Sequence, residues 1–311
     1  MRVVFGVPER AKSSTVLTIG NFDGLHLGHR TMLDRLKRKA EELGVSASVL
    51  TFEPHPRELF APDQAPARLT SLREKLALLE GCGIDFTYLC HFDRKFAALS
   101  ADAFIARTLV QGLAAKFVIV GEDFCFGKGR AGNVATLRAA GRQHGFAVET
   151  LTTVEFDGLR VSSSAVRDAL AADDLKLAEK LLGRPYAIAG RVVHGDKIGR
   201  TLGFPTANVQ LKRKRVALTG VFAVTVSGID KRHLPGAASI GLRPSIGEGL
   251  KPTLEVYLLD FDRDIYGAHV TVHFLHKLRD EAKFDSLDEL KDWIAKDVAA
   301  TRQFFSGGAH G

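Results

Sequence analysis

The sequence has little cysteine and no long apolar run. Its 311 residues include only three cysteines, Cys82, Cys90 and Cys125, and no pair has the spacing of zinc ligands. This argues against a disulfide framework and a structural metal, so we expect buried free thiols in a reducing compartment. No segment is apolar enough over sufficient length to span a bilayer, and residues 1–14 lack the apolar core of a signal peptide. We therefore expect a cytoplasmic protein with no membrane partner.

The charge balance is basic without being extreme. Lys and Arg number 43 against 36 Asp and Glu, a net charge of +7, which fits nucleic acid and polyphosphate substrates equally. The densest basic run, Lys212–Arg215, has no interleaved aromatic residues. We interpret it as a solvated loop or strand end and expect no nucleic-acid partner.

The first half of the chain alternates strands and helices. Strands are expected at residues 16–19, 46–52, 84–90, 117–120 and 147–150, and helices at 30–43, 71–79, 101–113 and 134–144. This alternation predicts an α/β domain whose mostly parallel sheet carries helices on both faces. Ligands of such sheets bind outside the carboxyl ends of the strands.

The second half has a different pattern. After a helical stretch at 165–182, strands are expected at 187–193, 221–226, 238–240, 253–259 and 269–275, with no helix between them. They predict an antiparallel barrel or sandwich. A last helix starts at Ser286, where Glu289 completes a capping box, and runs to about Phe305. Placing the boundary at Gly183 gives two domains, 1–183 and 184–311.

Residues 18–29 are the most informative segment. A buried strand passes there into a helix, and His26 and His29 stand at the start of that helix. A helix N-terminus binds anions through its free N–H groups, and histidine adds a donor or a charge where phosphate charge develops. A capped tight turn is the alternative. We expect a triphosphate site.

Further segments follow other strands of the first domain. His55 closes a strand with a proline-rich turn, a loop at 121–127 mixes aromatic rings with acids, and Ser162–Arg167 begins a helix. Each also has a structural interpretation, as a turn, a packed loop or a serine cap. The glycines of 127–132 match G-x-G-x-x-G and are followed by Glu149, but residues 121–126 separate them from the preceding strand, which disfavours a dinucleotide-binding turn.

These motifs resemble, in order, those of a known family. The run from Gly20 to His29 is similar to the HxGH nucleotidyltransferase signature, and Gly-Asn-Phe-Asp-Gly narrows it to the adenylyltransferase half of bacterial bifunctional riboflavin kinase/FAD synthetases. Ser162–Arg167 resembles the family pattern Ile-Ser-Ser-Thr-x-Ile-Arg. The resemblance implies that the FMN phosphate attacks the α-phosphorus of ATP, giving FAD and pyrophosphate.

The same resemblance implies roles for single residues. His26, His29 and Arg167 are the expected catalytic residues. Contacts to the nucleotide are implied for Gly20, Asn21, Phe22, Asp23, Gly28, Ser163 and Ser164. Contacts to the flavin are implied for His55, Asp123, Phe126 and Asn133. Cys125 stands where the family has arginine, which leaves one phosphate or flavin contact open.

The second domain holds a glycine-rich segment, 195–208. Its loop, with Gly195, Lys197 and Gly203, could close over phosphates through backbone N–H groups. Thr206 and Asn208 share one face of a strand and offer two neutral oxygens, a sparse ligand set that suits Mg²⁺ held mainly by ATP. A glycine-rich hairpin is the alternative.

The segment Gly-Phe-Pro-Thr-Ala-Asn at 203–208 resembles the riboflavin kinase signature. That resemblance implies a six-stranded antiparallel barrel in which Glu255 takes the proton of the ribityl 5′-hydroxyl as it attacks the γ-phosphorus of ATP. It also implies a flavin contact by Arg279, while Phe222 replaces the usual tyrosine. The expected ligands are riboflavin, FMN, ATP and FAD; the oligomeric state stays open. A single-activity enzyme and a nucleotide- or RNA-binding regulator remain as alternatives.

Overall fold

The structure is a computed structural model that describes residues 1–195, 198–245 and 249–307. The chain divides into two compact units. The first comprises Met1–Pro66 and Leu72–Ser162, and the second comprises Ala67–Ser71 and the chain from Ser163 onward.

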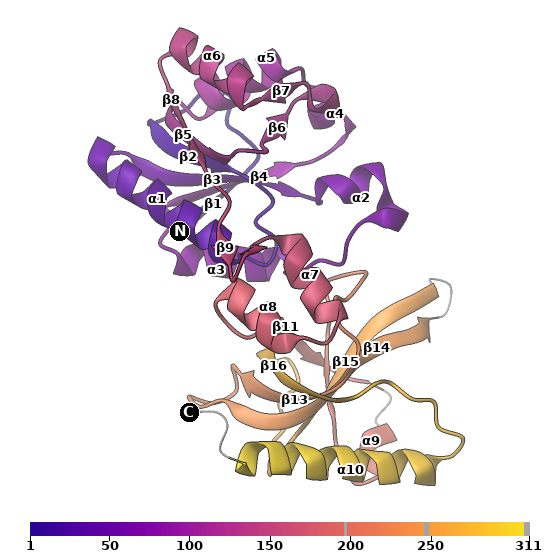
Figure 1. The fold of residues 1–311 in the computed structure, drawn as a ribbon. Coiled ribbons are helices and arrows are strands. Elements are labelled where there is room, and N and C mark those ends of the chain that lie inside the picture. The colour runs from indigo at the N-terminus through magenta and orange to yellow at the C-terminus, as the bar shows by residue number, and fades with distance from the viewer. Residues whose placement is uncertain (196–197, 246–248, 308–311) are drawn as a thin grey trace. The chain divides into compact units, whose positions relative to one another are not determined.

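The first unit is built on one six-stranded sheet in which all neighbouring strands are parallel (Figure 1). The strands, in order across the sheet, are β1 (Arg2–Phe5), β4 (Phe86–His91), β3 (Ser46–Glu53), β2 (Thr15–Ile19), β5 (Ala115–Gly121) and β8 (Ala147–Leu151). The predicted parallel α/β domain is confirmed. Strand β1 was not predicted, because it is a short edge strand whose side chains are only partly buried.

Helices cover both faces of this sheet, and a separate apolar core lies under each face. On one face, α1 (Leu27–Leu43) and α3 (Leu72–Gly81) pack through Leu33, Leu36 and Leu79. On the other, the π-helical segment η2 (Phe104–Gly112) and α6 (Val134–His144) pack through Leu109 and Leu137. The strands between them are buried on both sides, which accounts for their continuous apolar sequences.

The strand order has a topological switch at β2. The chain goes from β2 to β3 and β4 on one side, then returns to place β5 and β8 on the other side. Crevices at such switch points, outside the carboxyl ends of the strands, are where sheets of this type bind ligands. The turn that leaves β2 and enters α1 lies at this position, so the topology favours a ligand site at residues 20–29.

Short elements complete the first unit. They are α2 (Pro56–Phe60), η1 (Pro62–Gln64), α4 (Arg94–Ala97), α5 (Ala101–Ala103), β6 (Cys125–Phe126), η3 (Lys128–Arg130), β7 (Gly132–Asn133), β9 (Glu155–Phe156) and β10 (Leu159–Arg160). Strands β9 and β10 form a hairpin around Asp157 and Gly158, both at positive φ, as in a two-residue turn.

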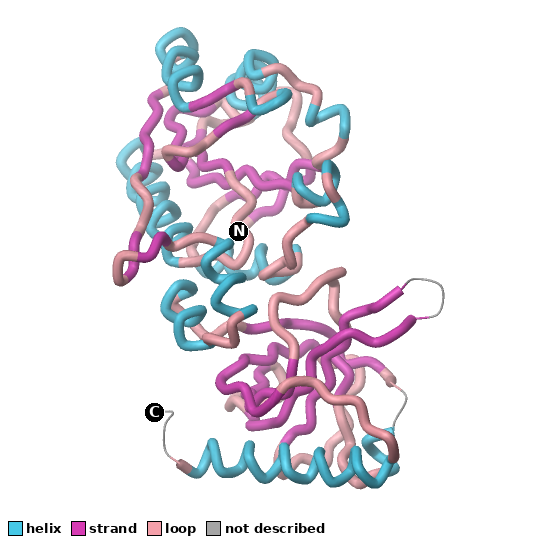
Figure 2. The backbone as a smooth tube through the Cα atoms, turned by 45° about the vertical axis from the view of Figure 1, so that its right-hand side comes forward, coloured by secondary structure: helices cyan, strands magenta, loops and turns pink. Residues whose placement is uncertain are grey.

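The second unit contains a closed six-stranded antiparallel barrel, drawn in magenta in Figure 2. Its strands, in order around the barrel, are β11 (Ala187–Val193), β12 (Ala207–Val209), β15 (Gly249–Leu258), β14 (Leu234–Ser245), β13 (Gly220–Ser227) and β16 (His269–Arg279). The short helix α9 (Ile198–Thr201) lies between β11 and β12, so the expectation of no helix between the strands is wrong at this point. Helix α10 (Leu287–Ser306) packs against the barrel and begins at the predicted cap, where Ser286 Oγ accepts the N–H of Glu289 at 3.1 Å. The predicted barrel and terminal helix are confirmed.

The helix predicted over 165–182 is wrong as a single element. The structure has α7 (Ser163–Ala171) and α8 (Leu175–Leu182), separated by Asp173 at φ +61°. Asp174 then caps α8 by accepting the N–H of Leu177 at 2.8 Å. An aspartate pair of this kind favours a turn followed by a new cap over continued helix.

The cysteines are free, as expected, but only one is fully buried. Cys90 lies in the core, where burial raises the pKa of its thiol to about 12 and keeps it protonated. Cys82 and Cys125 are half-buried, so the expectation of three buried thiols is wrong for these two. Within the described ranges, no helix is long and apolar enough to cross a membrane.

The interpretation of Lys212–Arg215 as a wholly solvated run is also wrong. Arg213 is buried, and its Nη1 donates to the carbonyls of Arg68 and Leu69 at 3.3 and 3.2 Å and to Tyr186 Oη at 3.1 Å. Arginine suits this position because its fork of N–H donors can serve several acceptors at once. Arg213 thereby fixes residues 68 and 69 to the second unit.

We predict that Arg213→Met lowers the free energy of unfolding of the second unit by about 2–4 kcal/mol, because buried acceptors lose a charged donor. The single tryptophan, Trp293 on α10, reports unfolding of this unit by fluorescence in urea. Lys214→Met, at the exposed neighbouring position, is the matched control and should change the midpoint little. Equal urea midpoints for Arg213→Met and Lys214→Met would contradict the stabilising role assigned to Arg213.

Candidate functional site

The turn between β2 and α1 is built around two stacked imidazole rings. His26 is the N-cap of α1, and its Nδ1 accepts the N–H of His29 at 3.4 Å. The ring centroids lie 3.7 Å apart with planes 19° from parallel, and Phe22 packs against His29 at 4.9 Å. A Cβ on Gly28 would come within 3.2 Å of His26 Nδ1. The small residue between the histidines thus permits the close stacking.

The backbone of this turn is strained. Phe22 and Leu25 have φ of +49° and +41°, although both carry large side chains that disfavour this region, and Gly24 has φ of +82°. Both side chains are buried in the core, with exposures of 1% and 0%. Such strain persists where surrounding packing imposes it and is common at ligand sites.

Three buried polar atoms around this turn have no hydrogen-bond partner within the part of the chain that the structure describes. They are Asn21 Oδ1, His29 Nδ1 and Arg30 Nε. An unsatisfied buried polar atom is costly, so three of them in one turn indicate a place where a polar ligand completes the bonding. Asn21 and His29 were predicted from the sequence. Arg30 was not, although its position directly after the second histidine was a usable signal.

His29 is also electrostatically unusual. Burial, the neighbouring His26 and the ammonium of Lys75 together hold the pKa of His29 well below its usual value. His29 is therefore the neutral imidazole at pH 7, a donor or acceptor of hydrogen bonds. Asp23 is buried in the same turn, and Gly20 leads into it directly after β2.

Of the predicted flavin residues of the first unit, His55, Asp123 and Asn133 each have a polar partner nearby. His55 caps α2, where its Nδ1 accepts the N–H of Arg57 at 3.2 Å. Asp123 is exposed and accepts from Arg160 Nη2 at 2.7 Å. Asn133 caps α6 by accepting the N–H of Thr136 at 3.0 Å. The structure therefore gives each a structural role, and a flavin role remains a prediction.

Phe126, by contrast, belongs to a chain of phenylalanine rings that was not predicted, because its members are scattered along the sequence. Phe126 packs on Phe104 and on Phe124, both with centroids 5.4 Å away. The chain continues from Phe104 through Phe96 to Phe92, and Phe60 packs edge-on against Phe92 at 5.9 Å. Phe60 is 68% exposed. An exposed ring at the end of a partly buried aromatic cluster provides a surface on which a planar ligand can stack.

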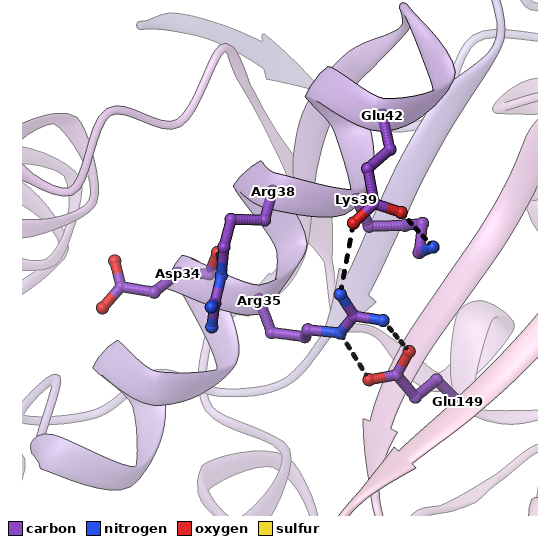
Figure 3. A network of polar contacts seen from close by, with 6 residues as sticks. All are labelled: Asp34, Arg35, Arg38, Lys39, Glu42 and Glu149. Atoms are coloured by element: carbon purple, nitrogen blue, oxygen red, sulfur yellow. Dashed lines mark hydrogen bonds and ion pairs between the residues drawn. The ribbon is translucent and has the colours of Figure 1, made fainter.

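The G-x-G-x-x-G match is not a dinucleotide-binding turn. Phe126 pairs with Gly132 in the small ribbon of β6 and β7, so the glycines lie between two short strands and not between a strand and a helix. Glu149, the acid that a ribose would need, is held by Arg35 through two hydrogen bonds of 2.7 and 2.8 Å (Figure 3). Arg35 also contacts Glu42 at 3.5 Å. This network joins α1 to the edge strand β8.

Ser163, Ser164 and Arg167 lie on α7, in the second unit. Ser163 and Ser164 form the first turn of the helix, and Arg167 follows one turn later. Arg167 Nε donates to the carbonyl of Ala67 at 2.6 Å. The serine-rich start of this helix, predicted from the sequence, is present; its phosphate role remains a prediction.

In the barrel, three predicted residues come together. Asn208 on β12 lies directly opposite Glu255 on β15 in the strand register, and Thr206 Oγ1 lies 3.4 Å from Glu255 Oε2. The three half-buried side chains present hydroxyl, amide and carboxylate oxygens on one face, which is the donor chemistry that Mg²⁺ prefers. Among the described residues, no group of three or more His, Cys, Asp and Glu is placed to hold a metal.

Three glycines shape this site. A Cβ on Gly195 would lie 2.4 Å from Asn208 Nδ2, so the absence of a side chain lets the loop approach the Asn208 amide. A Cβ on Gly199 would lie 2.4 Å from the carbonyl of Phe204. Gly203 is exposed at φ +88°, a conformation that favours glycine. Lys197, also predicted for this loop, lies outside the described residues.

The guanidinium of Arg279 is engaged by two residues of α10. Its guanidinium makes a two-pronged ion pair with Asp297 on α10, at 2.8 and 2.7 Å, and lies over the ring of Trp293 at 5.0 Å. Neither Asp297 nor Trp293 was predicted, because their pairing with Arg279 depends on how α10 packs. Phe222, the residue in place of tyrosine, is fully buried edge-on against Phe274.

Comparison with known proteins identifies the family of each half of the chain. A family model for FAD synthetase matches residues 9–165, and one for riboflavin kinase matches residues 182–305. The bifunctional riboflavin kinase/FMN adenylyltransferase of Escherichia coli (strain K12) is 50% identical over 305 residues, covering 98% of this chain and 97% of the relative. That of Pseudomonas fluorescens is 52% identical over 295 residues, covering 95% and 94%.

Similarity to a solved structure extends over the same length. The crystal structure of a Streptococcus pneumoniae protein, described as a macrolide-efflux protein, superposes with a TM-score of 0.80 at 31% identity, covering 96% of this chain and 98% of that one. The description as an efflux protein applies to the Streptococcus pneumoniae protein alone. Family models over both halves and near full-length identity lead to one conclusion: the chain belongs to the bifunctional riboflavin kinase/FMN adenylyltransferase family, enzymes that synthesise FMN and FAD.

Proposed function

We propose that residues 184–311 phosphorylate riboflavin and residues 1–183 adenylylate the resulting FMN, each with its own ATP. The chain is an enzyme of flavin cofactor synthesis. What we propose is which of its residues carry out each reaction. The observation that supports it most is that Thr206 Oγ1, just before β12, lies 3.4 Å from Glu255 Oε2 on β15, while Asn208 on β12 pairs with Glu255 in the strand register. Residues that are scattered in sequence from 206 to 255 form one oxygen-rich face there.

In the kinase reaction, Glu255 acts as the general base. It takes the proton from the ribityl 5′-hydroxyl while that oxygen attacks the γ-phosphorus of ATP, and ADP leaves. Thr206 and Asn208 would hold Mg²⁺, which when bound with ATP offsets the charge of the phosphates. Gly195 would bring its loop, with Lys197, over those phosphates. Arg279 would contact the flavin after release from Asp297.

In the adenylyl transfer, the FMN phosphate attacks the α-phosphorus of ATP and pyrophosphate leaves, without a protein nucleophile. His26 and His29 would stabilise the charge that develops on the α- and β-phosphates, as hydrogen-bonding groups fixed in advance. The turn residues Gly20, Asn21, Phe22, Asp23 and Gly28 would shape the nucleotide pocket. For Ser163, Ser164 and Arg167, contact with the pyrophosphate end rests on the sequence pattern alone.

The isoalloxazine ring of FMN would stack on the phenylalanine chain that ends at Phe60. The exposure of Phe60 and its edge-on contact with Phe92 support this placement of the flavin. His55, Asp123, Phe126 and Asn133 would line the same end of the sheet, since each follows a strand there or caps a helix there.

The three cysteines are free, which is typical of proteins in a reducing compartment, so we propose that the enzyme acts in the cytoplasm.

We predict that Glu255→Gln reduces kcat for riboflavin phosphorylation by about 100-fold or more, because general base catalysis is lost while the hydrogen bond with Thr206 is retained. Adenylylation of supplied FMN should stay unchanged. Chromatographic separation of riboflavin, FMN and FAD measures both rates. Glu179→Gln, at an exposed position of α8, is the control. Full kinase activity in Glu255→Gln would contradict the role of Glu255.

The substitution His26→Asn tests the adenylyl-transfer site in the same way. Asparagine is a good N-cap, so α1 should keep its start while the imidazole is removed. We predict a loss of adenylylation of about 100-fold, from lost transition-state stabilisation, with riboflavin phosphorylation intact. His144→Asn, an exposed histidine in the last turn of α6, should have wild-type rates. An unchanged rate of adenylylation in His26→Asn would contradict the catalytic role of His26.

Gly195→Ala tests the loop approach in the kinase site. The added methyl must push the Asn208 amide aside, because it would otherwise lie 2.4 Å from it. We predict a fall in kcat/KM for phosphorylation of about 10- to 100-fold. Gly307→Ala, whose Cβ would meet nothing closer than 3.4 Å, is the control. Wild-type kinetics in Gly195→Ala would show that this approach does not matter.

A further inference from the structure

Gly241 lies within β14, where glycine is unfavourable because it has no side chain to pack. Its backbone is not in the left-handed region, so conformational freedom does not explain the residue. A Cβ at this position would instead overlap both carboxylate oxygens of Glu281, which follows β16 in the segment that leads to α10. Glycine at position 241 therefore makes room for the Glu281 carboxylate against the barrel.

This carboxylate lies on the same side of the barrel wall as the proposed kinase residues. Gly241 pairs with Thr253 in the register of β14 and β15, and Ser239 pairs with Glu255. Directly paired residues, and residues two apart on one strand, point to the same face of a sheet. The intervening residues are buried in the barrel core: Ala238, Ile240, Leu254 and Val256. Glu281 is exposed, so its carboxylate shares an accessible face with Glu255.

The segment that carries Glu281 is fixed at both ends. It begins after Arg279, the last residue of β16, which pairs with Val221 of β13. Toward its other end Phe284 packs on Trp293 of α10, with ring centroids 6.5 Å apart. The backbone of Glu281 is thereby placed before a substrate binds, and a group fixed in advance loses little freedom on binding.

A carboxylate at this position favours one of the two kinase substrates over the other. An ionised carboxylate only accepts hydrogen bonds, and it repels phosphate. Riboflavin is uncharged, and its ribityl chain carries several hydroxyl donors. In the barrel, β15 lies between β12, which carries Asn208, and β14, which carries Gly241. The phosphates of ATP would thus lie toward β12 and riboflavin toward β14.

We propose that Glu281 binds riboflavin by accepting hydrogen bonds from hydroxyl groups of the ribityl chain, and so determines specificity in the kinase site. The proposal rests on the proposed role of Glu255 at the 5′-hydroxyl. Thr253, opposite Gly241, and Glu255 are two residues apart, about 7 Å along the strand. The ribityl hydroxyls are on consecutive carbons, so the 5′-hydroxyl can lie at Glu255 while hydroxyls nearer the ring lie at Glu281.

The test measures riboflavin phosphorylation at saturating ATP in the wild type and in Glu281→Ala. We expect KM for riboflavin to rise about 10-fold or more with kcat nearly unchanged, because the lost contact is made equally in the ground state and the transition state. Adenylylation of supplied FMN should keep its wild-type rate. Asp292→Ala, which removes an exposed carboxylate of α10, is the control. An unchanged KM, or a fall in kcat alone, would overturn the proposal.

Gly241→Ala displaces the same carboxylate without removing it. The three atoms nearest to the added methyl all belong to the carboxyl group of Glu281, the far end of a flexible side chain, so the barrel should fold normally. We expect the same rise in KM, and no further rise in the double variant, since the displaced carboxylate is then absent. Additive effects would contradict a shared cause. A wild-type KM in Gly241→Ala would overturn the proposal even if Glu281→Ala did not fold.

Lumiflavin, which has the flavin ring but no ribityl chain, tests the assigned hydroxyl contact. Titrations followed by flavin fluorescence should show that Glu281→Ala loses affinity for riboflavin and not for lumiflavin. An equal loss for both ligands would overturn the ribityl assignment in favour of a ring contact. These binding measurements do not depend on Glu255, so failure of its proposed role would be seen separately, as full kcat in Glu255→Gln.

Discussion

The need of buried polar atoms for partners organises the first domain's site. Packing of Phe22 and Leu25 in the core forces the turn after β2 into positive φ, and that turn leaves buried atoms of Asn21, His29 and Arg30 without partners in the described chain. A fold accepts this cost where a ligand repays it. The topological switch at β2 puts the turn at the edge of the sheet where nucleotides bind.

The proposed kinase site depends on strand pairing rather than on strained backbone. It has no unusual backbone in the residues that carry the chemistry; strand pairing alone sets Asn208 opposite Glu255 and brings Thr206 into contact with it. Glycine at position 195 is also required, since only a residue without a side chain lets this loop approach the Asn208 amide.

Much of the fold was predictable from sequence, because local patterns carry it. Strand and helix periodicity indicated both domains, and Ser286 with Glu289 marked the start of α10. Two local signals were overlooked: Asp157-Gly158, a strong hairpin pair, and the aspartates that end α7. Long-range packing was out of reach. Burial of Arg213 depends on residues 68 and 69, and the pairing of Arg279 with Asp297 depends on α10.

The most direct test of two active sites in one chain is a chromatographic time course of the purified full-length protein with riboflavin, ATP and Mg²⁺. FMN should appear first and FAD should follow as FMN is consumed, since each site performs one step. FMN accumulating without FAD, even when FMN is the starting substrate, would contradict an active first domain. Riboflavin that stays bound but unconverted would contradict the enzyme assignment and favour a binding regulator.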